Sequence, residues 1–261
     1  MGRAKLWRNL AVLLTVAFAG VAIAKAVGSP IRIPVGNLLV DFNLGSAPRK
    51  LPAHENAPIS FWGSIKIRTS DGSVPTQLEH VTSELDRFGD LETRGLPVCR
   101  RSQLLATTTP QARRQCPGAI VGTGIGTATI AFPDQAPFGA RAPLTFFNGP
   151  KIGGDDTVIV HAHLNVPVPT TYLVPLRIER IDRGIWGFRV ESDVPEIAGG
   201  SGSITGFSFR FDDREWRFED KEMHYILARC PTGRLQALIR AEFEDGTRME
   251  GHFIDPCQAR D

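Results

Sequence analysis

The sequence predicts an all-β protein, an antiparallel β-sandwich formed either as one large or as two small sandwiches. Three observations support this prediction. Apolar and polar residues alternate with a period of two along about a dozen short segments. Turns rich in Gly, Asp and Pro separate these segments, and no stretch keeps a helical period for more than about two turns. Many short strands with regular turns are typical of antiparallel sandwiches.

The exception to the strand pattern is a short helical insertion, predicted at about residues 99–116 and closed by a Cys99–Cys116 disulfide. Thr109 precedes Pro110, and a hydroxyl cap followed by proline at the first helical position favours a helix start there. Closing a loop of this length stabilises a fold by about 3 kcal/mol in the chain-entropy description. We therefore expect this insertion to be held in place by its own cross-link.

The strand segments share the two-residue period and end at turn residues. In chain order they are residues 38–44, 59–68, 77–88, 119–131, 158–166, 172–181, 185–190, 203–211, 216–218, 224–229, 235–243 and 249–254. Phe207, Phe209 and Phe211 fall on one face of their strand, which indicates core packing. The run Val166–Pro169 contains two prolines and is predicted to bound an edge, because proline cannot donate to a sheet.

Residues 1–26 have the form of a signal peptide or an N-terminal anchor. A basic start is followed by an uncharged apolar run over residues 10–24, shorter than the ~20 residues that span a bilayer. Residues 27–57 are predicted to be a lead-in with one strand and a Pro-rich loop, followed by the sandwich domain over residues 58–261. The predicted location is secreted or extracytoplasmic at the cell surface, with a membrane anchor through residues 10–26 as the alternative.

Four cysteines in an exported chain indicate two disulfides. Three pairings are formally open, and we favour Cys99–Cys116 and Cys230–Cys257 because each pair brackets its own short unit. A structural zinc site is the competing interpretation. It is disfavoured because the chain has no C-x-x-C pair and because export favours oxidation.

The charge balance gives no sign of a nucleic-acid partner. The whole chain carries 30 Lys and Arg against 28 Asp and Glu, a net charge of +2, and residues 1–24 contribute three of the basic residues and none of the acidic ones. The remaining chain is therefore close to neutral and slightly acidic. Nucleic acid and anionic membrane surfaces attract strongly basic domains, so we expect no nucleic acid, and a membrane only through an uncleaved leader. No sequence motif indicates a cofactor.

His161 and His163 are the candidate metal ligands, because residues two apart on a strand point to the same face. Two imidazoles could bind a metal that a carboxylate from a neighbouring strand completes. No third ligand can be identified from its spacing in the sequence. Two histidines on a half-exposed sheet face explain the pattern without a metal.

Two glycine-rich stretches suggest loops or close contacts. Residues 122–126 lack the spacing of a nucleotide loop and no helix follows them, so alternating glycines here predict that another chain segment crosses closely. Gly199, Gly200 and Ser201 form a flexible stretch that we predict to be a binding or crossover loop. The G-x-S-x-G pattern of a nucleophile elbow is absent around Ser201.

Several local patterns recur together in one order: Gly95-Leu96-Pro97-x-Cys99, Ala119–Gly122 after Cys116, Phe146–Gly149, the glycine run before Ser203, and Cys230-Pro-x-Gly233. In this the chain resembles a group of uncharacterised exported β-rich proteins of high-GC Gram-positive bacteria, over most of residues 58–257. The resemblance implies a shared scaffold of cysteines and glycine turns. It implies no activity, ligand or catalytic residue.

Two functions follow as hypotheses. The first is a secreted or cell-envelope protein without catalytic activity that acts as a binding or structural module. The second is an extracellular hydrolase or metal-dependent enzyme that uses His161, His163 and nearby loop carboxylates. A deep pocket that brings the histidines and a carboxylate together would favour the second.

Overall fold

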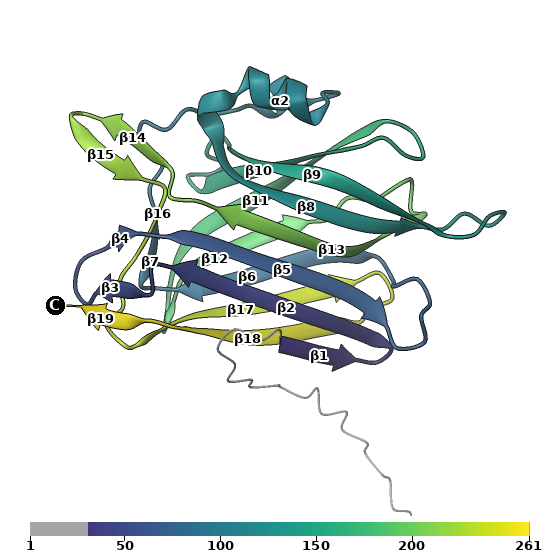
Figure 1. Cartoon of the computed structure of the whole chain (residues 1–261), viewed down its shortest axis with the longest axis horizontal. Helices are drawn as coiled ribbons and strands as arrows, with labels where there is room; N and C mark the ends of the chain where they lie inside the picture. The colour runs from purple at the N-terminus through teal and green to yellow at the C-terminus, as the bar shows by residue number, and fades with distance from the viewer. Residues whose placement is uncertain (1–30, 261) are drawn as a thin grey trace, which may run out of the picture.

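The computed structural model describes residues 31–260 and confirms the all-β antiparallel class, with 61% strand and 6% helix (Figure 1). The main sheet contains β1 (Ile31–Val35), β2 (Leu38–Ala47), β5 (Ser60–Thr69), β6 (Leu78–Asp86), β8 (Ile120–Ile130), β9 (Phe138–Asn148), β10 (Asp156–Leu164), β11 (Thr170–Arg183), β12 (Trp186–Asp193), β13 (Gly202–Phe211), β17 (Arg234–Phe243) and β18 (Arg248–Pro256). The signal peptide or anchor predicted at residues 1–26 lies outside the described residues.

The main sheet is curled so that its two halves face each other. Its 12 strands follow the order β1-β2-β5-β13-β8-β9-β10-β11-β12-β6-β17-β18, and every neighbouring pair is antiparallel. The edge strands β1 and β18 contact each other without pairing, so the sheet is nearly closed into a barrel. This arrangement brings the two edge strands against each other, which shields them from the pairing with other chains that leads to aggregation.

Seven short strands lie at the ends of the long ones: β3 (Lys50–Pro52), β4 (Ala57–Pro58), β7 (Gly89–Leu91), β14 (Glu215–Phe218), β15 (Lys221–His224), β16 (Ile226–Ala228) and β19 (Gln258–Arg260). The sheet β4-β16-β7, which we call the end sheet, covers one end of the barrel at the left of Figure 1. The pairs β14-β15 and β19-β3 lie at the same end (Figure 1).

The lead-in predicted over residues 27–57 with one strand is corrected by the structure. Its described part contains β1, β2, β3 and β4, and β1 and β2 belong to the main sheet. Ile31, Ile33, Val40 and Phe42 pack into the core beside β17 and β18. Pro34 concealed β1 in the sequence, but an edge strand tolerates proline because one side of its backbone makes no ladder bonds.

Strand β9 was also missed by the sequence pattern. It contains Pro143 within a run of Gly, Ala and Arg residues that has little strand propensity. Pro143 pairs with Ile125 of β8, whereas pairing with β10 extends only to Leu144. Pro143 therefore lies just beyond the part of β9 that pairs with a strand on each side, where backbone N–H groups must donate to both neighbours.

The helical insertion forms as predicted, with α1 (Arg101–Leu104), α2 (Thr109–Gln115) and the 3-10 turn η1 (Pro117–Ala119). Its apolar side chains, Leu104 and Ala112 among them, pack with Phe147 and Ile159 on the outer face of the main sheet. Helix α2 begins one residue earlier than expected: Thr108 is its N-cap, and the Thr108 N–H donates to the Gln111 side chain at 2.8 Å.

Both predicted disulfides are present, Cys99–Cys116 and Cys230–Cys257, and no cysteine in the described chain is free. Two disulfides indicate an oxidising, extracytoplasmic environment. Within residues 31–260, no helix combines the length and the apolar character that crossing a membrane requires.

Candidate functional site: an apolar cavity inside the barrel

The inner face of the sheet is apolar and lines a cavity of about 440 Å³. Strand β11 contributes the alternating residues Tyr172, Val174, Leu176 and Ile178, and the opposite strands supply further rows of the same kind. Among the other lining residues are Val158, Val160, Ala162, Leu164, Phe207, Phe209 and Phe211. The phenylalanines predicted to face the core therefore do so, but they face a core that contains a cavity.

The burial pattern along β11 shows that side chains do not fill this interior. Inward-facing Val174, Leu176 and Ile178 are only half-buried, whereas outward-facing Leu173 is buried under the helical insertion. Barrels of about eight strands are just filled by their own side chains, and wider ones leave space. A volume of 440 Å³ falls within the range of ~300–1,000 Å³ that ligand pockets occupy.

A few polar atoms interrupt the apolar wall. Ser83, Thr127 and Ser192 line the cavity, and the buried Oγ of Ser192 has no hydrogen-bond partner among residues 31–260. An unsatisfied buried hydroxyl costs about 1–3 kcal/mol, so such groups usually meet a ligand or water. The wall thus combines a large apolar surface with a few hydroxyl groups, among them the unpartnered one of Ser192.

The loop predicted from Gly199, Gly200 and Ser201 lies at one end of the cavity, between Ile197 and Ile204, which both line it. Gly199 and Gly200 adopt positive φ, which glycine allows without strain. An isolated antiparallel β-bridge between Ile197 and Gly202 closes the turn. The loop itself does not line the cavity, so its predicted binding role stays a prediction, while its crossover role from β12 to β13 is evident.

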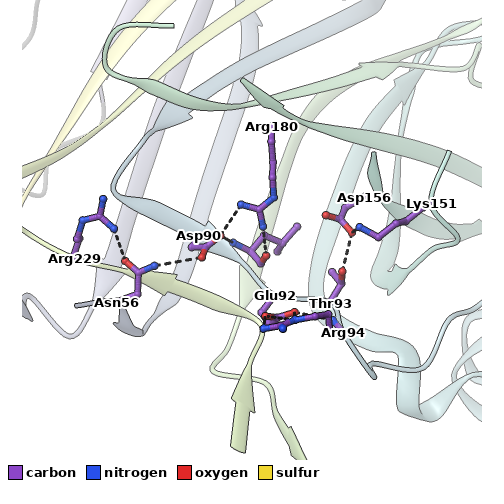
Figure 2. A network of polar contacts seen from close by, with 10 residues as sticks. Asn56, Asp90, Glu92, Thr93, Arg94, Lys151, Asp156, Arg180 and Arg229 are labelled. Atoms are coloured by element: carbon purple, nitrogen blue, oxygen red, sulfur yellow. Dashed lines mark hydrogen bonds and ion pairs between the residues drawn. The ribbon is translucent and has the colours of Figure 1, made fainter. Parts of the chain in front are cut away.

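The opposite end is covered by the end sheet, whose strands β7 and β16 line the cavity, and Figure 2 shows the polar contacts of Asp90 and of the segment that follows it. Arg180 holds this segment: it donates to the Asp90 carboxylate at 2.8 Å and to the Leu91 carbonyl at 2.6 Å. Further along, Thr93 donates to Asp156 at 2.8 Å, and Lys151 pairs with the same carboxylate. These contacts place charged side chains where the apolar wall ends.

A second, polar pocket of about 330 Å³ adjoins the cavity at this end. Gly89, Asp90 and Phe188 line both spaces. We call the second space the arginine pocket, because its lining includes Arg87, Arg180 and Arg229. Its remaining lining residues are Asn56, Ile181, Asp182 and Gly187.

The candidate metal ligands lie elsewhere, on the outer face of β10 beneath the helical insertion. His161 is fully buried and its Nε2 donates to the Thr107 carbonyl at 3.0 Å, while His163 Nδ1 lies 3.1 Å from the Thr171 hydroxyl. The pair shares one face, as predicted, but within residues 31–260 no group of three or more His, Cys, Asp or Glu side chains is placed to hold a metal ion. The metal hypothesis therefore gains no third ligand from the described chain.

The loop carboxylates at the start of β10, Asp155 and Asp156, are held by basic side chains. Asp155 accepts from Arg177 at 2.7 Å, and Asp156 pairs with Lys151 at 2.8 Å. The structure does not bring these carboxylates together with His161, which points away from the cavity that Val160 and Ala162 line.

We expect His161 to make stability depend on pH. Burial lowers the pKa of His161 below its ordinary value of 6.5, and the hydrogen bond to Thr107 opposes this only in part. Because the unfolded chain then binds a proton that the folded chain does not, the free energy of unfolding should fall as pH drops below about 6.5. A decrease of about 1 kcal/mol between pH 7.5 and pH 5.5 is expected from urea unfolding.

The variant His161→Gln is the comparison for this prediction, because glutamine keeps an amide donor for the Thr107 carbonyl and does not titrate. The difference in unfolding free energy between the unmodified protein and His161→Gln should change by the same amount, about 1 kcal/mol between pH 7.5 and pH 5.5. His224, whose pKa is raised by Asp213 and Glu222 despite its partial burial, is common to both proteins and cancels. A difference that is constant from pH 7.5 to pH 5.5 would contradict the prediction.

The arginines of the pocket were not identified in the sequence, although one signal was available. The inward row of β11 continues from Tyr172 through Ile178 at a period of two and reaches Arg180 at its next position. A charge at the end of an apolar row indicates the rim of a barrel. Arg87 and Arg229 had no such signal, because only the fold brings their segments beside β11.

A scan against protein-family models, a search of curated proteins and a search of solved structures each found no match to this chain.

Proposed function

We propose that the protein is a secreted or cell-envelope binding protein that holds an apolar ligand inside its barrel. The cavity carries this proposal: a space of about 440 Å³ with an almost wholly apolar wall. Transferring an apolar group from water into such a wall is favourable at roughly 25 cal/mol per Å² of buried surface. This proposal is the binding module, the first of the two functions considered from the sequence, and it adds that the ligand is apolar.

The incomplete packing of the inner face supports a ligand rather than a purely structural role. A wall of half-buried Val, Leu, Ile and Phe side chains forgoes the dispersion contacts of a packed interior. A bound apolar molecule restores those contacts. The two disulfides support an extracytoplasmic setting, where apolar molecules need a carrier to pass through water.

Binding of the neutral fluorophore Nile red tests the proposal. We expect saturable binding with a large rise in fluorescence, and we expect Ala162→Phe to weaken it at least tenfold, because the added ring occupies the cavity. Ala162 lines the space between Leu144 and Tyr172 on the neighbouring strands. Val174→Phe, on the neighbouring strand β11 and also lining the cavity, serves as a second filling variant.

Thr123→Phe is the matched control, because Thr123 lies exposed on the outer face of β8 and gains a ring of the same size. Circular dichroism and thermal unfolding establish that each variant is folded. Absence of saturable Nile red binding to the unmodified protein would refute the proposal, as would equal weakening by the cavity variants and the control.

A further inference from the structure

We infer that the ligand is an amphiphile whose anionic headgroup lies in the arginine pocket while its apolar chain fills the barrel. This inference rests on the proposed function and deepens it. Its starting point is the continuity of the two spaces: an apolar cavity and a polar pocket share Gly89, Asp90 and Phe188 as lining residues.

The geometry of β11 and β12 places the pocket at the mouth of the cavity. Arg180 pairs directly with Phe188 across the two strands, and directly paired residues share a face of the sheet. Phe188 lines the cavity, so Arg180 extends from the inner face at its rim. The Arg180 guanidinium lies 4.9 Å from the centre of the Phe188 ring, which brings a cation to the point where the apolar wall ends.

The charge of the pocket favours an anion. Its lining includes three arginines and two aspartates, which leaves one positive charge in excess. Asp90 pairs with Arg180 at 2.8 Å and Asp182 with Arg87 at 3.6 Å. Arg229 is the cation that remains: within the described part of the chain it has no carboxylate partner, and it donates instead to the Asn56 side-chain oxygen at 3.1 Å.

Arg229 is also positioned in advance for a ligand. It stacks over the Phe88 ring at 5.3 Å, and its hydrogen bond to Asn56 continues to Asp90, since the Asn56 amide donates to that carboxylate at 3.3 Å (Figure 2). A guanidinium presents several donors in a planar fork that matches the oxygens of a carboxylate or a phosphate. The ligand that fits both spaces is therefore a long apolar chain that ends in a carboxylate or phosphate group.

Displacement of Nile red by two ligands with the same chain tests the inference. Hexadecanoate should bind at least about tenfold more tightly than hexadecan-1-ol, the factor that 1.4 kcal/mol represents. Arg229→Gln should remove most of this preference by weakening hexadecanoate about tenfold while leaving the alcohol unchanged. Asp90→Asn, which removes a competing carboxylate, should strengthen hexadecanoate binding several-fold.

Arg141→Gln is the control, because Arg141 is an exposed arginine of β9 that lines neither space. Equal affinity for the acid and the alcohol, or equal weakening of both by Arg229→Gln, would overturn the inference and leave the proposed function standing. Calorimetric binding of acetate or inorganic phosphate as tight as that of hexadecanoate would also overturn it, because the pocket would then be a site for free anions. Failure of Nile red and both long-chain ligands to bind would instead refute the proposed function itself.

Discussion

Replacing Cys230 and Cys257 with serine is expected to lower the free energy of unfolding by about 3.5 kcal/mol, the chain-entropy value for a loop of this length. The two cysteines are 27 residues apart and buried together with Leu51 and Ala228. Since Cys230 follows β16 and Cys257 follows β18, the bond ties the end sheet to the main sheet. Urea unfolding of the oxidised protein and the double variant at pH 7.5 measures the effect.

The double variant of Cys99 and Cys116 is the comparison, with an expected decrease of about 3 kcal/mol because its loop is shorter, 17 residues. That disulfide anchors the insertion on the outer face, away from the cavity. We therefore expect Nile red to dissociate faster only from the Cys230 and Cys257 variant. Equal dissociation rates for both variants would contradict the assigned role of the end sheet.

Gly124→Ala should destabilise the protein by about 3 kcal/mol, the upper part of the usual range for overpacking. Gly124 lies in β8 beside β13, and an added Cβ would overlap the backbone carbonyl oxygen of Ser208. Backbone atoms within a sheet cannot move aside as a flexible side chain can. Thermal and urea unfolding of the variant measure the loss.

Gly139→Ala is the matched control, because a Cβ at Gly139 on neighbouring strand β9 meets no atom of the described residues within 4 Å. This substitution should be neutral or slightly stabilising, since alanine has less conformational freedom to lose on folding. If both alanine variants lost the same stability, the close approach of β13 to β8 would not be the cause.

The sequence predicted those features that depend on local pattern. Alternation along residues 203–211 predicted β13 and the inward direction of its phenylalanines, and the two cysteine pairs were identified because each closes a short local unit. The close crossing predicted at residues 122–126 is confirmed by the contacts of Gly122 and Gly124 with β13. Strands β1 and β9 were missed because proline and small residues weaken the local signal without preventing pairing in their places in the sheet.

By itself, then, the sequence determined the class, the insertion and its cross-links, because period, turn chemistry and cysteine spacing act over a few residues. Only the tertiary structure decided that twelve strands curl into one nearly closed sheet, that its interior keeps a cavity, and that Arg87, Arg180 and Arg229 meet at its mouth. The physical reason is that strand order and the volume a closed sheet encloses depend on pairings between distant segments. No local pattern encodes which segments will be neighbours.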